Sequence, residues 1–337
     1  MNYQQAVEET RRACQAHAAD KTAALRAMVR CATLAPSGHN TQCWRFRIRD
    51  DAIEVLPDWS RRTPVVDPDD HHLHVSLGCA IENLALAARA FGFEARSSHD
   101  AVSGSNTVTL APAAAEETDR FRAIAERQCT RAEYDGKALA NGELVQLEAA
   151  GQGRGVGMLV LTDHQAMERV LEYVVEGNTR QVGDPAFVRE LEHWIRFSDR
   201  EAVARGDGLS ARATGAPPAP RWLGRWLFRA FFRARPEADK YARQIRSSAG
   251  IAVFHSAVDD TAHWVEAGRC YQRFALQATA LGIRNAFLNQ PVEASDLRPE
   301  FAAALGLDGA RPDLVVRFGR GPVMPKSLRR PVDAVLD

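Results

Sequence analysis

Residues 35–46 combine a turn with two amide side chains, which is a suitable arrangement for binding a flat polar ring. The segment reads Ala-Pro-Ser-Gly-His-Asn-Thr-Gln-Cys-Trp-Arg-Phe. Its proline and glycine end a helix expected over residues 23–34, so backbone N–H groups become free to face a ligand. Asn40 and Gln42 can each donate and accept hydrogen bonds, as the uracil-like edge of a flavin requires. A turn that only ends a helix before an edge strand needs the same residue types. The segment therefore fits either a ligand-binding turn or an ordinary connection.

This segment resembles the nitroreductase superfamily, whose members carry Ala-Pro-Ser-x-x-Asn-x-Gln-Pro-Trp-x-Phe, and within it the Acg-like flavin-binding proteins. The sequence departs from that pattern at Cys43, where the family has proline. The change leaves the backbone less fixed and would put a thiol near the flavin edge. The resemblance implies FMN as the cofactor and a turn that binds its ring. The residues matched to that turn are Pro36, Ser37, Gly38, His39, Asn40 and Gln42.

Residues 127–134, Arg-Gln-Cys-Thr-Arg-Ala-Glu-Tyr, resemble the family's Arg-x-Ser/Thr-x-Arg/Lys element, which holds the flavin phosphate. The guanidinium groups of Arg127 and Arg131 can bracket a dianionic phosphate with charge-assisted hydrogen bonds. Cys129 stands where the family prefers a hydroxyl, so one phosphate hydrogen bond is either lost or supplied by Thr130. Taken alone, an Arg-x-x-x-Arg pattern indicates only a solvated helix face.

Two further segments, both in the C-terminal third of the chain, resemble the nitroreductase superfamily. Residues 313–331 predict a strand followed by a basic loop, where the family places cations near the phosphate and the flavin ring. Lys326 and Arg329 are the matching residues. A positive charge there would stabilise the anionic reduced flavin. Gln290 lies where the family's loop passes over flavin N5, although Asn-Gln-Pro is also an ordinary turn sequence.

Two expected helices share a pattern of small residues. Gly78 to Gly92 matches Gly268 to Gly282, which lies 190 positions further along, and alanines coincide between the glycines at helical spacing. We favour an internal duplication over a chance similarity of alanine-rich helices. Ordinary nitroreductases are homodimers with flavin sites across the subunit interface. The resemblance therefore implies an intramolecular pseudo-dimer, with halves at residues 1–115 and 116–337.

The fold implied by the resemblance is α+β and nitroreductase-like. Each half is expected to be a mixed, mostly antiparallel sheet wrapped by helices. Apolar periodicity independently predicts strands at residues 43–48, 53–56, 156–161, 250–255 and 314–318.

Residues 186–245 form an insertion in the second half. Residues 187–203 predict an amphipathic helix, and a stiff Gly-Ala-Pro-Pro-Ala-Pro break follows at 215–220. A second helix then carries arginines at every fourth position among tryptophan, leucine and phenylalanine residues. The arginines are Arg221, Arg225, Arg229 and Arg233. Such a helix could lie on an anionic membrane surface. We favour a lid or partner-contact helix, because a flavin cleft offers apolar surface to cover.

The composition is that of a soluble globular protein. The chain has 337 residues, 45% hydrophobic and 26% charged, with 43 basic against 43 acidic residues. This balance gives no general attraction to nucleic acid, and no nucleic-acid partner is expected. We see neither an apolar signal sequence nor a run of about 20 apolar residues. We therefore expect a cytoplasmic protein without membrane association.

Cysteine and histidine patterns do not indicate a metal site. The six cysteines contain no Cys-x-x-Cys pair, which argues against a zinc ribbon or a disulfide scaffold, and we expect most of them to be reduced. Residues 69–74, Asp-Asp-His-His-Leu-His, lack further ligands at suitable spacing, so no metal is expected. Dinucleotide-fold, P-loop and Gly-x-Ser-x-Gly motifs do not occur.

These features predict an FMN-binding oxidoreductase. NAD(P)H would serve as the possible electron donor, and nitroaromatic or quinone-like small molecules would serve as acceptors. The flavin carries such chemistry, so no catalytic side chain is assigned. The alternative is an FMN-sequestering or storage protein whose lid blocks nicotinamide access. Both a monomeric pseudo-dimer and a homodimer fit the sequence.

Overall fold

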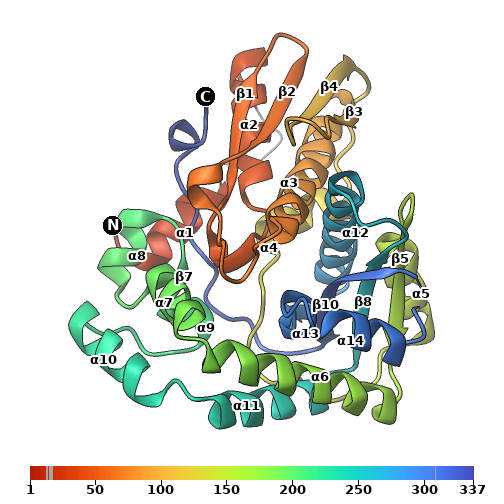
Figure 1. Ribbon diagram of the computed structural model, residues 1–337. Helices are drawn as coiled ribbons and strands as arrows, with labels where there is room; N and C mark the ends of the chain where they lie inside the picture. Colours follow the sequence, from red (N-terminus) through yellow and green to blue (C-terminus); the bar gives the residue numbers. More distant parts are fainter. Residues whose placement is uncertain (13, 15–17, 308) are drawn as a thin grey trace.

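The computed structural model describes residues 1–12, 14, 18–307 and 309–337, and contains two four-stranded antiparallel sheets (Figure 1). The first has the order β1-β2-β4-β3, with β1 (Trp44–Ile48), β2 (Ala52–Pro57), β3 (Phe93–His99) and β4 (Asn106–Pro112). The second has the order β5-β8-β10-β9, with β5 (Val156–Leu161), β8 (Gly250–Ser256), β9 (Arg284–Phe287) and β10 (Arg311–Gly319). All five predicted strands are confirmed.

Helices surround both sheets. They are α1 (Tyr3–Arg12), α2 (Lys21–Thr33), α3 (His71–Ala90), α4 (Asp119–Glu126), α5 (Asn141–Gly151), α6 (His164–Gly183), α7 (Pro185–Trp194), α8 (Asp199–Arg205), α9 (Ala211–Thr214), α10 (Arg221–Phe231), α11 (Ala234–Arg246), α12 (Thr261–Ala280), α13 (Gln290–Glu293) and α14 (Arg298–Ala304). Short 3-10 turns occur at η1 (Gly38–Asn40), η2 (Trp59–Arg61) and η3 (Val332–Ala334). The α+β class is therefore confirmed.

The two sheets have the same connectivity. In each, the second and third strands in chain order are joined through a twenty-residue central helix, α3 in the first sheet and α12 in the second. These helices pack on each other in the middle of the molecule (Figure 1). The contact is reciprocal: a β-carbon on Gly78 would lie 1.9 Å from the Val265 carbonyl oxygen, and one on Gly268 would lie 1.9 Å from that of Val75. Both matched glycines thus allow the backbones to touch.

The C-terminal segment returns from the second sheet to the first. The Phe46 amide donates to the Val335 carbonyl at 2.8 Å, and the Asp337 amide donates to the Phe46 carbonyl at 2.8 Å. This pairing brings residues 320–337 alongside strand β1. The basic loop near the chain's end therefore lies beside the 35–46 turn, although the two are far apart in sequence.

The insertion differs in part from its prediction. Six helices, α6 to α11, lie between β5 and β8, whereas β1 and β2 are joined directly. The predicted helix over 187–203 is wrong as one element: α7 ends at Trp194, and β6 (Ile195–Arg196) pairs with β7 (Leu209–Ser210). The break is held by Arg196, whose Nε and Nη2 donate to Asp207 Oδ1 at 3.0 and 2.7 Å. Both side chains are buried, and separating them would leave an unpaired buried charge, so the chain keeps this break in the helix.

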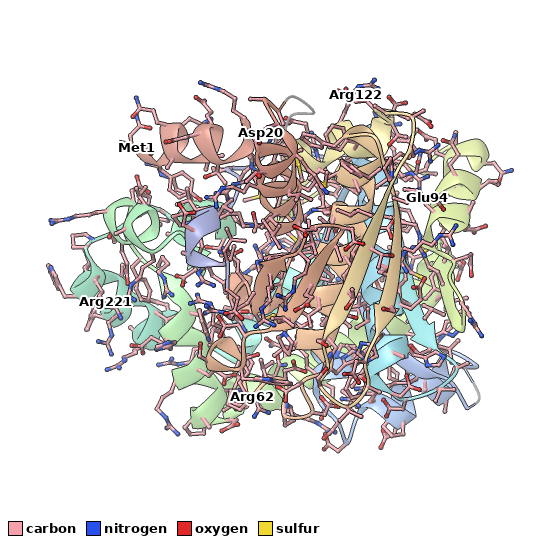
Figure 2. All side chains as sticks on the ribbon, turned by 90° about the horizontal axis from the view of Figure 1, so that it is seen from above. Met1, Asp20, Arg62, Glu94, Arg122 and Arg221 are labelled. Carbon is pink, nitrogen blue, oxygen red and sulfur yellow. A yellow bond between two sulfur atoms is a disulfide. The ribbon has the colours of Figure 1, made fainter. Side chains whose placement is uncertain are left out.

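Cysteine pairing differs from the prediction at one place. Cys14 and Cys31 form a disulfide, with 5.0 Å between their Cα atoms. The other four cysteines are free, as expected. Among the described residues, we find no helix that is both long and apolar enough to cross a membrane. Long polar side chains project from the outer surface, as Figure 2 shows.

Candidate functional site

A central cavity of about 620 Å³ lies where both halves and the insertion meet. The first half contributes η1, a segment at 63–67 and the start of α3. The second half contributes residues 127–131 and 286–293, and the C-terminal segment contributes Ser327 and Arg329. Helices α6, α7, α9, α10 and α11 supply much of the remaining wall, and Arg11 of α1 also lines the cavity. Because no single sheet forms it, this cavity exists only when the halves pack together.

Ten of the twelve residues expected to bind cofactor line this cavity. They are Pro36, Ser37, Gly38, His39, Asn40, Arg127, Cys129, Arg131, Gln290 and Arg329. The structure thus brings together four stretches of sequence that were matched separately.

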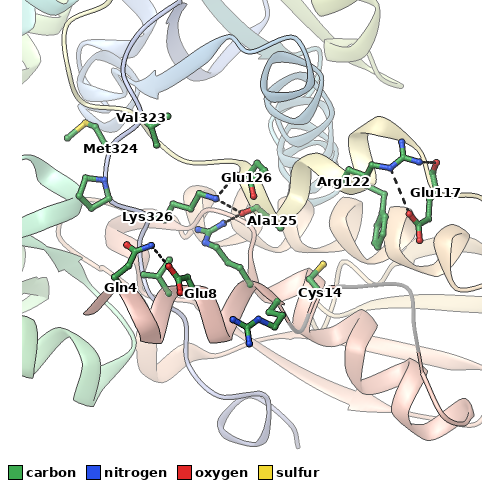
Figure 3. Close-up of a pocket in the computed structure, with 15 residues that line it drawn as sticks. Gln4, Glu8, Cys14, Glu117, Arg122, Ala125, Glu126, Val323, Met324 and Lys326 are labelled. Atoms are coloured by element: carbon green, nitrogen blue, oxygen red, sulfur yellow. Dashed lines mark hydrogen bonds and ion pairs between the residues drawn. The ribbon is translucent and has the colours of Figure 1, made fainter. Parts of the chain in front are cut away.

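The remaining two residues have other partners. Gln42 is fully buried: its Nε2 donates to the Gly206 carbonyl at 2.8 Å, and its Oε1 accepts from the Arg330 amide at 2.9 Å. Lys326 donates to Glu126 Oε2 at 2.6 Å and lines a second cavity of about 930 Å³, shown in Figure 3. Neither lines the central cavity, so we leave both out of the candidate site.

The turn at 36–42 has an unusual backbone. His39, Asn40 and Gln42 all adopt positive φ angles of 46°, 54° and 55°. Such conformations are unfavourable for residues other than glycine and often occur at functional sites. The Asn40 Nδ2 donates to the Gly208 carbonyl at 2.9 Å, so this amide links the turn to the insertion. Only its Oδ1 is then free for a ligand.

Three buried arginines gather at the cavity wall. Arg11, Arg127 and Arg329 are 7%, 2% and 6% exposed. The acceptors of their hydrogen bonds are backbone carbonyls, apart from a 3.9 Å contact from Arg127 to the Cys129 sulfur. Within the described parts of the chain, none of the three forms an ion pair with a carboxylate. Uncompensated buried cations are costly, which indicates a place for an anion.

The arginines also repel one another. Burial, and then the Arg127 charge, lower the pKa of Arg11 to about 9. Burial, and then the charges of Arg11 and Arg127, hold the pKa of Arg329 well below its ordinary value. The sequence analysis missed Arg11, because at the end of α1 it looks like an ordinary C-terminal helix cation.

Several polar atoms in the cavity wall have no hydrogen-bond partner. His39 Nδ1, Arg127 Nε and Gln290 Oε1 are all buried and unpaired. Burial, the Arg131 charge and the His72 charge lower the pKa of His39 to about 4, so its imidazole is neutral near pH 7. The cavity therefore offers a donor, an acceptor and a neutral imidazole nitrogen, which suits a ligand with alternating donors and acceptors.

A second polar group lies at the start of α3. Asp67 accepts from the backbone amides of His72 and Leu73 at 2.9 Å each. His72 Nε2 lies 3.3 Å from Asn289 Nδ2, and Asn289 Oδ1 is held by the Val315 amide at 3.0 Å. The amide group of Asn289 thus donates to His72, which leaves the His72 Nδ1–H to face Asp67. Burial lowers the pKa of His72, but the nearby Asp67 carboxylate raises it above its ordinary value.

Asp67 and His72, together with His71, form a cluster of the kind that can hold a metal ion. Possible ligand atoms of Asp67, His71 and His72 lie within 4.8 Å of one another. However, His71 Nε2 contacts Asp313 Oδ1 at 3.0 Å, and His72 and Asp67 have the hydrogen bonds described above. These contacts account for the cluster without an ion. That no metal binds here stays a prediction.

The insertion closes one side of the cavity with apolar side chains. They come from α7, the segment after it, α10 and α11, and include Phe187, Phe197, Phe228, Phe232 and Tyr241. Phe228 and Phe232 stack with 4.7 Å between ring centroids. A flat aromatic ligand would thus meet a polar wall on one side and an aromatic wall on the other.

Comparisons with known proteins find distant relatives that match most of the chain. No protein-family profile matches the chain. It is 26% identical over 327 residues to a protein of Mycobacterium tuberculosis H37Rv provisionally named an NAD(P)H nitroreductase, covering 93% of this chain and 91% of the relative. An uncharacterized protein of the same strain is 24% identical over 328 residues, covering 93% and 92%. Both relatives are thus matched over nearly their whole length.

Solved structures show weaker similarity. An FMN-bound nitroreductase from Desulfitobacterium hafniense gives a TM-score of 0.40 at 18% identity, covering 64% of this chain and 95% of its own. An FMN-dependent nitroreductase from Mycobacterium smegmatis, in complex with NADPH, gives 0.39 at 17% identity, covering 60% and 87%.

Proposed function

We propose that the protein is an FMN-dependent oxidoreductase of the nitroreductase superfamily, related to its Acg-like group, and that FMN fills the central cavity. The observation that carries this proposal is the group of buried arginines without carboxylate partners, Arg11, Arg127 and Arg329, beside the strained 36–40 turn. A dianionic phosphate would supply the missing negative charge. The cavity volume of about 620 Å³ suits a cofactor of this size.

Each part of the cavity would then have a distinct task. Arg127, Arg329 and Arg11 would bind the phosphate, with Arg131 nearby. His39 and Gln290 would bind the polar edge of the ring through their unpaired atoms, beside the 36–38 turn. FMN, when bound, supplies the transfer of hydride or electrons between NAD(P)H and an acceptor. The protein then needs only to position the ring, exclude water and balance its charge.

The two halves would form a pseudo-dimer of residues 1–115 and 116–337. The identical strand order of the sheets and the reciprocal glycine contacts between α3 and α12 support this internal duplication. One chain would then contain what two subunits supply in a homodimer. A single chain could therefore build one complete site, and light scattering would distinguish monomer from homodimer.

The alternative function is FMN sequestration or storage. The aromatic wall from α7, α10 and α11 favours it, because these side chains would cover the ring on the side away from the 36–40 turn and leave no room for a nicotinamide to stack. If α10 moves aside, nitroaromatic or quinone-like acceptors can reach the ring. If it stays in place, binding itself is the function.

The test begins with the absorption spectrum of the purified protein, followed by anaerobic addition of NADPH. Bleaching of the flavin band would support the reductase, whereas a stable flavin spectrum would favour sequestration. Absence of flavin even after FMN is added would contradict both. Arg131→Ala should lower flavin content strongly, because this side chain lines the cavity and donates only a 3.5 Å hydrogen bond, to the Ala213 carbonyl. The matched control Arg122→Ala, on the exposed side of α4, should keep its flavin.

A further inference from the structure

Helix α10 carries apolar side chains on two sides. On its inner side, Leu227 and Phe228 line the central cavity. On its outer side, Trp222 and Trp226 lie one turn apart and are 73% and 61% exposed. Phe231, at the end of the helix, is 67% exposed, and its ring centroid lies 6.5 Å from that of Trp226. Three large exposed aromatic residues on one eleven-residue helix are unusual for a free surface. Figure 1 shows α10 at the lower left edge of the molecule, away from both sheets.

The same helix is basic. Its sequence, Arg-Trp-Leu-Gly-Arg-Trp-Leu-Phe-Arg-Ala-Phe, contains no acidic residue, and Arg233 and Arg235 follow. Glu201 pairs with Arg221, and Glu192 pairs with Arg225 and Arg229. The three paired arginine side chains are still 50%, 43% and 61% exposed. The region therefore presents positive charge on a protein whose overall formal charge is zero.

We propose that α10 docks on the surface of an anionic lipid bilayer. Tryptophan and phenylalanine favour the boundary between head groups and acyl chains, and neighbouring arginines attract anionic head groups. A helix of eleven residues is about 16 Å long, too small to supply the roughly 800 Å² per partner of a stable protein interface. A lipid surface needs no such complementary area. The helix would lie in the interface and would not span the bilayer.

The sequence suggested either a lid or a membrane contact for this helix. In the structure, α10 can serve as both. The inner side of α10 covers the cavity while its outer side meets lipid. An apolar acceptor dissolved in the bilayer would then reach the protein next to the cavity. The docking itself rests on exposed side chains and charge, so it does not depend on FMN binding.

The experiment is co-sedimentation of the full-length protein with phosphatidylglycerol–phosphatidylcholine vesicles and with pure phosphatidylcholine vesicles. We expect binding to the anionic vesicles only, weakened by salt, with a blue shift of tryptophan fluorescence. The triple variant Trp222→Ser, Trp226→Ser, Phe231→Ser should bind at least about tenfold more weakly. Arg233→Glu with Arg235→Glu should also reduce binding, because both residues are exposed.

Trp59→Ser provides the matched control, since Trp59 is 49% exposed but lies on η2 in the first half. It should leave vesicle binding unchanged. Thermal melts should show that the α10 variants remain folded. Failure of the wild-type protein to sediment with anionic vesicles would overturn the proposal. So would a dimer in light scattering that the triple variant dissociates, because the partner would then be a second copy of the chain.

Discussion

Gly78 of α3 lies directly against the backbone carbonyl of Val265 in α12, so close that a β-carbon would come within 1.9 Å of the carbonyl oxygen. Gly268 has the same relationship with Val75. The two central helices therefore touch through matched positions, as two copies related by an approximate twofold axis would.

Replacement of Gly78 by alanine should destabilise the protein by about 3 kcal/mol, because the obstructing atoms are backbone and the helices must separate. Gly268→Ala should cost a similar amount. The control is Gly142→Ala in α5, where a β-carbon would meet nothing within 4 Å and the cost should be near zero. Urea unfolding followed by circular dichroism measures all three. Equal stabilities for Gly78→Ala and Gly142→Ala would show that the close helix contact is wrong.

Removing the phosphate from the ligand should weaken binding by at least about 100-fold, since two or more charge-assisted hydrogen bonds are lost. Fluorescence titration of the apoprotein with FMN and with riboflavin measures this ratio. In Arg127→Gln, FMN affinity should fall by roughly 10- to 100-fold, and riboflavin affinity should change much less. A similar loss for both ligands would indicate that Arg127 supports the fold and does not bind phosphate.

Glu192→Gln should loosen the lid. Its carboxylate accepts from Arg225 Nε at 2.6 Å and Arg229 Nε at 2.8 Å, and these two contacts tie α10 to α7. Hydrogen exchange of residues 221–232 should accelerate by roughly tenfold, and added NADPH should reduce bound flavin faster. Glu116→Gln, which breaks the exposed pair with Arg89, is the control. Unchanged exchange in 221–232 would show that the Glu192 contacts do not hold the lid.

Lowering the pH should also loosen the contact between α10 and α7. Burial raises the pKa of Glu192, but its hydrogen bonds from Arg229 and Arg225 more than offset this, so the net pKa is lowered. The stabilisation is therefore present above the unfolded value of about 4.5 and is lost as the pH falls through the lower, folded value.

His39→Asn should make stability less dependent on pH. The pKa of His39 is lowered from 6.5 to about 4, chiefly by burial, so the unfolded chain binds its proton first as the pH falls. Its stabilising contribution is present above pH 6.5 and should decrease by about 2 kcal/mol by pH 5. Asparagine accepts the positive φ of 46° at this position, so strain should not obscure the effect.

Denaturant titrations at pH 7 and pH 5 provide the measurement for His39→Asn. His164→Asn is the control, because that side chain is 81% exposed on α6. If His39→Asn kept the full wild-type loss of stability between these pH values, His39 would not be the buried neutral group described here.

Much of the architecture could be read from local sequence. Strands β1, β2, β5, β8 and β10 were predicted because apolar residues repeat with strand periodicity. The two central helices were predicted from the matched pattern of small residues that begins at Gly78 and Gly268. The structure shows that these glycines leave room for the backbone of the other helix. These features depend on residues that are close together in the sequence, so the residue pattern alone predicts them.

The sequence did not predict the direction of individual side chains or the contacts between residues that are far apart in the chain. Lys326 faces Glu126 and Gln42 faces Arg330, so both leave the cavity that their neighbours line. The break after Trp194 depends on the buried Arg196–Asp207 pair, and the Cys14–Cys31 disulfide depends on how α1 and α2 approach.

The sequence by itself indicated five of the strands, two helices with a shared pattern of small residues and most residues of the candidate site, because these follow from local periodicity and motif spacing. Only the tertiary structure decided that Arg11 joins Arg127 and Arg329, and that α10 covers the cavity with one side and exposes the other. Those relationships join residues from distant elements. They come into existence only when burial of the shared core brings the halves together.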